Sequence, residues 1–170
     1  MFNAIHFYRI ARWLYLHHIP FLPKFFQLLI FLFYNSNISY KCDIGKKTKF
    51  SHGGIGILFN DKVKIGENCG IGANVSIVGQ TPHINVPVLK DDIRISPGAV
   101  IQGPVIIESH VMIGANAVVN KSVPEYAIVA GIPARIIGDV RNLDYKRTTK
   151  AFKEGWKDYL TTNDDKQKHH

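Results

Sequence analysis

Apolar residues recur at every sixth position through the middle of the chain, in three runs. The runs are Ile38, Ile44 and Phe50; Phe59, Ile65, Ile71 and Ile77; and Leu89, Ile95, Ile101, Ile107, Ile113 and Val119. Because a helix repeats every 3.6 residues and an amphipathic strand every 2, a period of six fits short strands that each end in a corner. Three hexads would close one triangular coil. The pattern therefore predicts about five stacked coils over residues 38–137, with the apolar column buried along their centre.

Two apolar segments, Ile5–Ile19 and Phe25–Tyr34, precede the repeat and are separated by Pro20 and Pro23. The second segment is far shorter than the roughly 20 residues of a membrane-spanning helix, and the prolines interrupt any longer span. We predict two short helices joined at residues 18–23. Their apolar faces either pack on the domain or a neighbouring subunit, or lie in a membrane interface with basic residues toward anionic headgroups.

The composition is that of one globular domain of 170 residues with a formal net charge of +8. This charge favours anionic partners, but it is spread thinly along the chain, so we expect no nucleic-acid binding. The two cysteines, Cys42 and Cys69, cannot build a disulfide framework or a Cys-rich zinc site. We therefore expect no bound metal and a reducing, cytoplasmic location, at the inner face of the membrane if the helices bind lipid.

Several segments resemble one protein family. The segments "KIGENCGIGANVSI", "VIIESHVMIGANAVVNKSVP" and "IVAGIPARIIG", with the opening "ISYKCDIGKKTKFSHGGIGILF", are similar to the hexapeptide-repeat acyltransferases, and in particular to their serine acetyltransferase branch. The resemblance implies a mainly β fold, a left-handed parallel β-helix, over residues 37–138. This β-helix would follow a helical segment at 1–36 and precede a tail at 139–170. Within the tail, Ala151–Leu160 is predicted to form a short helix. It also implies a homotrimer with acetyl-CoA bound between adjacent prisms.

His52 interrupts the repeat between Phe50 and Phe59. Transfer of an acetyl group from a thioester to a hydroxyl needs a base for the hydroxyl proton, and histidine suits this role near neutral pH. Gly53 would let the backbone approach a ligand closely. By resemblance, His52 stands where serine acetyltransferases carry their catalytic base; the alternative is a surface histidine on a loop.

Two neighbouring positions depart from the family pattern. The family orients its base with an aspartate fifteen residues earlier, and this chain has Asn37 there. An amide can hold the ring tautomer but cannot offset the charge of an imidazolium. The serine enzymes also carry an aspartate at the position of Ser51, where it helps to hold the ammonium of serine. A hydroxyl replaces that charge poorly, which argues against L-serine as the acceptor.

His83 lies in a second interruption, the segment GQTPHINVP, yet stays in phase with the six-residue column. It is therefore a candidate either for a core corner or for an exposed loop, and the flanking Pro82 favours the loop. In related enzymes a histidine of this loop reaches the active site of the neighbouring subunit. There it can stabilise the oxyanion or hold the acceptor.

Small residues at the corners suit the pantetheine arm of acetyl-CoA, which makes strand-like hydrogen bonds to the backbone. The predicted set is Gly79, Gly98, Ala99, Gly103, Ala115 and Ala117, with Lys121 and Arg135 for the phosphates. By resemblance, Gly79 and Ala99 line the thioester end of this groove. The alternative is that these residues only make tight corners.

The sequence thus predicts an acetyl-CoA-dependent O-acetyltransferase in which His52 activates the acceptor hydroxyl. The leading acceptor is a sugar of a bacterial surface polysaccharide or its precursor, because Asn37 and Ser51 replace the aspartates and the helical segment is short. Serine O-acetyltransferase of cysteine biosynthesis is the alternative. A sugar N-acetyltransferase and a non-catalytic β-helical assembly protein are weaker ones.

Overall fold

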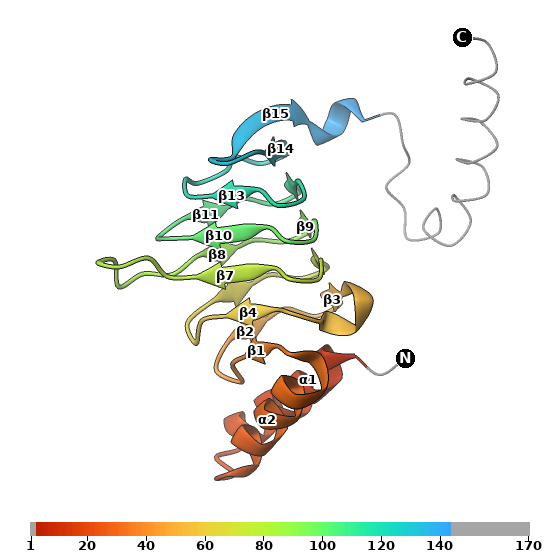
Figure 1. The fold of residues 1–170 in the computed structure, drawn as a ribbon, viewed down its shortest axis with the longest axis vertical. Helices are drawn as coiled ribbons and strands as arrows, with labels where there is room; N and C mark the ends of the chain where they lie inside the picture. Colours follow the sequence, from red (N-terminus) through yellow and green to blue (C-terminus); the bar gives the residue numbers. More distant parts are fainter. Residues whose placement is uncertain (1–2, 144–170) are drawn as a thin grey trace, which may run out of the picture.

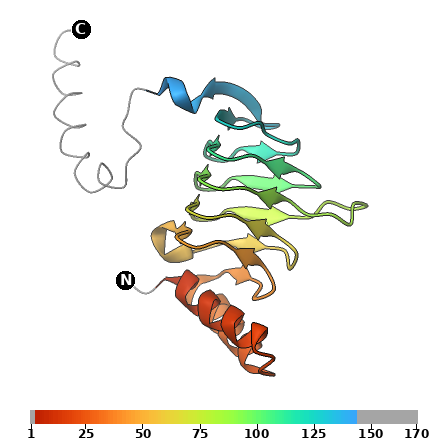
Figure 2. The same cartoon turned by 180° about the vertical axis from the view of Figure 1, so that it is seen from behind.

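The six-residue period becomes strand geometry directly, because each apolar residue of the column is the inward residue of a strand of two or three residues. The structure is a computed structural model that describes residues 3–143. The strands stack into a three-sided parallel β-helix with two helices across one end (Figures 1 and 2). This confirms the predicted fold class. The predicted helix Ala151–Leu160 lies outside the described residues.

Each side of the prism is one sheet. The first sheet holds β1 (Asn37–Ile38), β4 (Leu58–Phe59), β7 (Ser76–Val78), β10 (Val100–Gln102) and β13 (Val118–Val119). The second holds β2 (Asp43–Ile44), β5 (Lys64–Ile65), β8 (Val88–Leu89) and β11 (Ile106–Ile107). The third holds β3 (Lys49–Phe50), β6 (Gly70–Ile71), β9 (Arg94–Ile95), β12 (Met112–Ile113), β14 (Ala127–Ala130) and β15 (Arg135–Asp139).

A regular coil is three hexads long, and two insertions lengthen the coils that contain them. In the first sheet Leu58 pairs with Ser76 and Val100 with Val118, which is one regular coil in each case. The step from Asn37 to Leu58 is longer by half a hexad, and that from Ser76 to Val100 by a whole hexad. The extra residues lie in the segments 51–57 and 79–87, which contain His52 and His83. Both histidines therefore sit where the repeat is interrupted.

The column predicted from the sequence forms the core. Ile71, Ile77, Ile101 and Ile107 are completely buried. The residue two positions before a column residue also points inward. Val75, which stands two positions before Ile77, is completely buried as well. Four coils are complete, and a fifth consists of β13, a single parallel bridge between Ile107 and Val123, and β14.

The helices α1 (Ala4–Leu16) and α2 (Leu22–Tyr34) lie across the end of the prism at β1 (Figure 1). The Asn3 side chain caps α1 by accepting a hydrogen bond from the Ile5 amide. Pro23 lies in the first turn of α2, where proline costs no hydrogen bond, so it starts this helix rather than breaking it. The α2 helix ends at Asn35, which adopts a left-handed conformation.

At the other end of the prism the chain reverses. β15 returns antiparallel to β14 and becomes the last strand of the third sheet. A short 3-10 helix, η2 (Val140–Asn142), follows it. It is capped by Asp139, which accepts a hydrogen bond from the Arg141 amide and also forms an ion pair with the Arg141 side chain at 2.6 Å.

Candidate active site

The predicted site residues fall on two edges of the prism. We call the edge where the chain passes from the third sheet to the first the His52 edge, made of residues 51–57, 72–75, 96–99 and 114–117. The edge where it passes from the first sheet to the second is the His83 edge, made of residues 39–42, 60–63, 79–87, 103–105 and 120–122. The first sheet separates them (Figure 1).

His52 lies in the tight turn η1 (Ser51–Gly54), where it adopts φ 53° and ψ 35° and Gly53 adopts φ 77°. Left-handed residues occur at many corners of this prism, so this conformation alone does not mark a site. The surroundings of the His52 ring are more informative. The ring is exposed, and within residues 3–143 it makes no hydrogen bond or ion pair. The imidazole is therefore available to a substrate.

The backbone of the His52 turn is held firmly from two sides. The Ser36 hydroxyl donates to the Gly54 carbonyl at 2.7 Å and accepts from the Ile57 amide at 2.9 Å. The Asn3 side chain donates to the Phe50 carbonyl at 2.8 Å. A Cβ at Gly54 would lie 2.9 Å from the Cβ of Ala4, so helix α1 packs directly on the turn. The turn thus fixes the His52 backbone and leaves its side chain exposed.

Asn37 lies near the same edge but contacts a different residue. Its amide oxygen accepts a hydrogen bond from the Gln27 side chain of α2 at 2.9 Å. Within the described residues no hydrogen bond joins Asn37 to His52. Sequence reasoning missed Gln27, although it is the single polar residue in the segment FFQLLIFLFY. Ser51, next to His52 in the chain, is exposed, and Gly53 is buried.

His83 is exposed in the loop 79–87, and its amide donates to the Gln80 carbonyl at 2.7 Å. This settles the two sequence alternatives in favour of the loop. The insertion equals one whole hexad, which explains why His83 keeps the phase of the column without entering the core. The loop projects from the edge opposite the His52 turn (Figure 1), so one chain does not bring the two histidines together.

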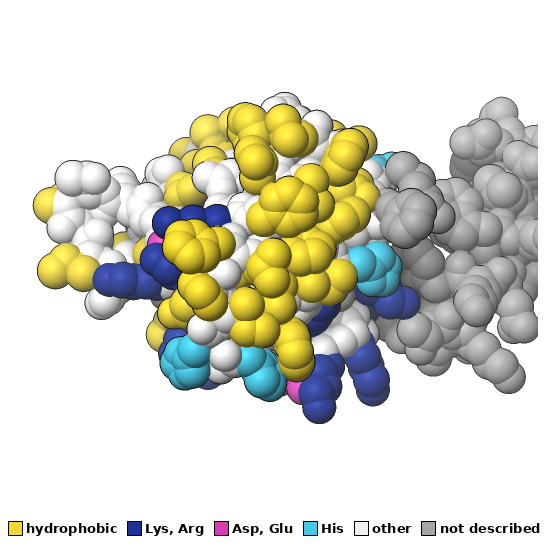
Figure 3. All heavy atoms as spheres, turned by 90° about the horizontal axis from the view of Figure 1, so that it is seen from below, with side chains coloured by type: hydrophobic (Ala, Val, Ile, Leu, Met, Phe, Trp, Pro, Cys, Tyr) yellow, Lys and Arg dark blue, Asp and Glu magenta, His cyan; other side chains and the backbone are white. Residues whose placement is uncertain are grey.

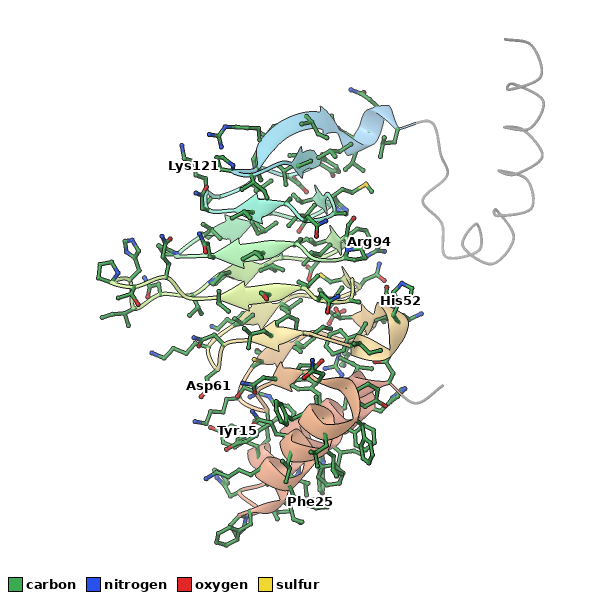
Figure 4. All side chains as sticks on the ribbon, in the orientation of Figure 1. Tyr15, Phe25, His52, Asp61, Arg94 and Lys121 are labelled. Atoms are coloured by element: carbon green, nitrogen blue, oxygen red, sulfur yellow. The ribbon has the colours of Figure 1, made fainter. Side chains whose placement is uncertain are left out.

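The residues predicted for acetyl-CoA divide between the edges. Gly98, Ala99, Ala115 and Ala117 lie on the His52 edge; Gly79, Gly103 and Lys121 lie on the His83 edge. Figure 4 shows His52 and Lys121 on opposite sides of the prism. Lys121 is exposed, and Arg135 on β15 is exposed as well. The Arg135 guanidinium donates to the Ala134 carbonyl at 2.9 Å.

The side chains of Ala99 and Ala117 are completely buried in the core and cannot line an outer groove. Only their backbone could therefore face a ligand, and their place beside acetyl-CoA stays a prediction. The Ala99 carbonyl already accepts from Ser76 and the Ala117 carbonyl from Val100, at 3.0 and 2.8 Å. A structural constraint also explains why position 98 is a glycine. Gly98 has φ +75°, and a Cβ there would lie 2.0 Å from the Asn116 side-chain oxygen.

Neither cysteine suits a covalent step. Cys42 and Cys69 are both buried. Burial raises the pKa of Cys42 to about 12 and raises that of Cys69 as well. Both thiols are therefore protonated at neutral pH and poorly nucleophilic.

A shallow polar cleft lies between α2 and the first coils of the prism. It has a volume of about 360 Å³ and is lined by Lys24, Gln27, Ser39, Tyr40, Lys41 and Asp61. Hydrogen bonds from Ser39 and Lys41 hold the pKa of Asp61 below its usual range. Within residues 3–143, no group of three His, Cys, Asp or Glu side chains could hold a metal ion.

Two family models match parts of the prism. The model described as bacterial transferase hexapeptide (six repeats) matches residues 87–121, and the hexapeptide repeat of succinyl-transferase matches residues 62–80. Together with the three-sided β-helix, they identify the central part of the chain as hexapeptide repeats of the kind that these transferase models describe.

The similar proteins indicate which branch of the hexapeptide-repeat acyltransferases this chain resembles. A serine acetyltransferase of Synechococcus elongatus is 30% identical over 138 residues, which are 80% of this chain and 56% of that protein. A serine acetyltransferase solved in complex with CoA has a TM-score of 0.72 and 32% identity, over 79% of this chain and 55% of that one. The Neisseria gonorrhoeae serine acetyltransferase solved in complex with serine has a TM-score of 0.72 and 29% identity, over 78% and 54%.

The chain belongs to the hexapeptide-repeat acyltransferase superfamily and lies on its serine acetyltransferase-like branch. It spans about half the length of the curated relatives it matches.

Proposed function

We propose that the protein is an acetyl-CoA-dependent O-acetyltransferase in which His52 is the general base. The observation that carries this proposal is the His52 turn: an insertion of half a hexad in an otherwise regular coil, with a fixed backbone and an exposed imidazole. A purely structural β-helix has no need of such an insertion. The CoA complex of a related enzyme supports acetyl-CoA as the acetyl donor.

The reaction is a direct transfer. The acceptor hydroxyl gives its proton to the unprotonated nitrogen of His52 as its oxygen attacks the thioester carbonyl. The tetrahedral intermediate then collapses, the bond from carbon to sulfur breaks, and the CoA thiolate leaves with the electron pair. The His52 imidazolium returns the proton to that sulfur, so the products are an O-acetyl ester and free CoA. No covalent enzyme intermediate is needed, which agrees with the buried cysteines.

We further propose that the active site forms between two copies of the chain in a homotrimer. His52 lies on one edge of the first sheet, and His83 and Lys121 lie on the other (Figures 1 and 4). The His52 edge of one copy facing the His83 edge of the next would bring the two histidines together. Lys121 would then lie beside the same groove, where its exposed ammonium can bind the CoA phosphates.

The acceptor that the relatives favour is L-serine, because the proteins similar to this chain are serine acetyltransferases and one was solved with serine bound. No relative reported above supports the polysaccharide sugar that the sequence alone suggested. We therefore propose L-serine as the first acceptor. A sugar hydroxyl is the second candidate, favoured by two observations: Ser51 offers no carboxylate to the serine ammonium, and Asn37 is bonded to Gln27 instead of the base.

The test is release of CoA thiol from acetyl-CoA, with L-serine saturating and the full chain as the enzyme. We expect serine-dependent release that His52→Ala lowers by about a hundredfold or more, because general-base catalysis contributes that much. His6→Ala removes another exposed histidine, from α1, and is the matched control. Full activity in His52→Ala would contradict the assigned base. Binding of CoA without serine-dependent release would move the acceptor to the sugar class.

A further inference from the structure

The outward face of the helical pair is unusually apolar. Figure 3 views the molecule from the helical end and shows side chains of this kind gathered across it. The exposed members are Ile10, Trp13, Tyr15, Leu16, Phe21, Leu22, Phe25, Leu28, Phe31, Leu32 and Phe33. We call this set the helical face. Soluble proteins rarely leave so many large apolar side chains together in water, so such a patch marks an interaction site.

The prism does not need this face for its own stability. Helix α1 buries Ala4, Ile5, Tyr8, Ala11 and Leu14, and the first three belong to the same hydrophobic cluster as the core of the prism. The buried residues of α2 are Pro23 and Ile30, although nearly all of this helix is apolar. α2 is thus an outer layer whose apolar side faces away from the protein.

The charges beside the helical face are mainly basic. Residues 3–42 contain no acidic side chain. Lys24 is exposed on α2, and Arg9 of α1 donates to the Gly45 carbonyl, which places the exposed Lys46 and Lys47 beside that helix. The first acid in the chain, Asp43, faces Arg12 at 3.6 Å. Figure 3 shows an apolar surface surrounded by basic and histidine side chains, with only a little acidic surface between them.

We propose that the helical face docks on the surface of a lipid bilayer that contains anionic headgroups. The apolar side chains would enter the boundary of the acyl chains, and the basic rim would meet the headgroups. A second copy pressed face to face would instead bring like charges together. Each helix has 13 residues and is only about 20 Å long, so the pair would lie in the membrane surface. Among the described residues no helix is long and apolar enough to cross a bilayer.

Docking would also place the His52 turn near the lipid. The N-terminus of α1 packs on the His52 turn through Ala4 and Gly54. In Figure 4, His52 lies beside β3, toward the helical end of the prism. The inference itself needs no acetyl transfer, so a binding experiment tests it independently of the proposed function.

The experiment is co-sedimentation of the full chain with vesicles of phosphatidylcholine alone or with about one-third phosphatidylglycerol. We expect binding to the anionic vesicles to be at least about tenfold stronger, and to weaken as salt is raised. Leu32→Ser with Phe33→Ser should lower it at least about tenfold, because two large side chains no longer leave water. The matched control is Ile136→Ser with Ile137→Ser at the far end of the prism; the four residues are 63, 70, 60 and 66% exposed.

Three results would overturn the proposal. One is equal binding to neutral and anionic vesicles, and another is equal loss in both double variants. The third is a helical-face variant that dissociates the lipid-free protein but still binds vesicles, since the face would then be covered by a second copy. Circular dichroism and thermal melting establish that each variant is folded. If the Leu32 and Phe33 variant does not fold, Lys24→Glu should still weaken anionic binding several-fold, and unchanged binding by that variant overturns the proposal.

Discussion

The prism and the helical pair contain the same kinds of apolar residue and place them in opposite ways. In the prism, Ile101 is completely buried between the coils above and below it. In α2, Phe33 is 70% exposed. A coil has a neighbour on each side, and its inward column is enclosed by three sheets. The helical pair has the prism on one side only. Apolar content alone therefore does not locate a core; the period does, and so does the number of sides on which an element is packed.

The largest expected effect is on the free energy of unfolding, and it differs between a substitution in the prism and one in the helical pair. Ile101→Ala should lower the free energy of unfolding by about 2–5 kcal/mol, because it leaves a cavity in a close-packed column. Phe33→Ala, which removes a larger side chain from the helical face, should change it by no more than about 0.5 kcal/mol. Urea denaturation followed by circular dichroism measures both. Similar losses in the two variants would mean that the helical face is packed against the protein in solution.

A smaller effect tests the contact between the two regions. The buried Tyr8 hydroxyl of α1 donates to the Cys42 carbonyl at 2.7 Å and accepts from the Ile44 amide at 3.2 Å. Burial raises its pKa to about 12, so it stays protonated and can donate. Tyr8→Phe should cost about 1–3 kcal/mol, because two buried backbone groups lose their partner. Chemical denaturation gives the value, with the exposed Tyr15→Phe as control; equal stability of Tyr8→Phe and the wild type would contradict the contact.

The smallest effect lies at the far end of the prism and depends on pH. The Arg141 side chain lowers the pKa of Asp139 to about 2, from an unfolded value near 3.9. A lowered pKa stabilises the fold above the unfolded value, and this contribution is lost as pH falls from about 4 toward 2. Arg141→Gln should therefore reduce the melting temperature slightly at pH 6, and the difference should shrink below pH 4. Melting curves across this range measure it; a difference independent of pH would assign the effect to packing instead.

The sequence is sufficient to predict the prism because the same pattern of apolar residues recurs in every hexad. Each hexad places one apolar residue inward, and an error at one position is corrected by the coils on either side. The same regularity revealed the insertions, since a break in a period is visible without a structure. It also made His83 ambiguous, because an insertion of one whole hexad leaves the phase of the period unchanged.

The contacts of the candidate site were harder to predict. Asn37 stands where the family carries the residue that orients the base, but its amide oxygen accepts a hydrogen bond from Gln27 on the preceding helix. Pairing of single polar side chains leaves no periodic signal. The small residues Ala99 and Ala117 suit a ligand groove, yet their side chains are buried inside the corner, at a position where other hexads carry residues such as Val75. A corner and a ligand groove select the same residue types, so composition cannot separate them.

The stacking of the coils also has a consequence for how the chain folds. Strands that pair within the parallel sheets lie no further apart in sequence than Ser76 and Val100, even where an insertion lies between them. Parallel sheets usually need distant segments to meet, and this slows their formation. Here each coil needs only the one before it, so order can spread along the chain one coil at a time. The parallel strands of this protein can therefore pair without contacts between segments far apart in the chain.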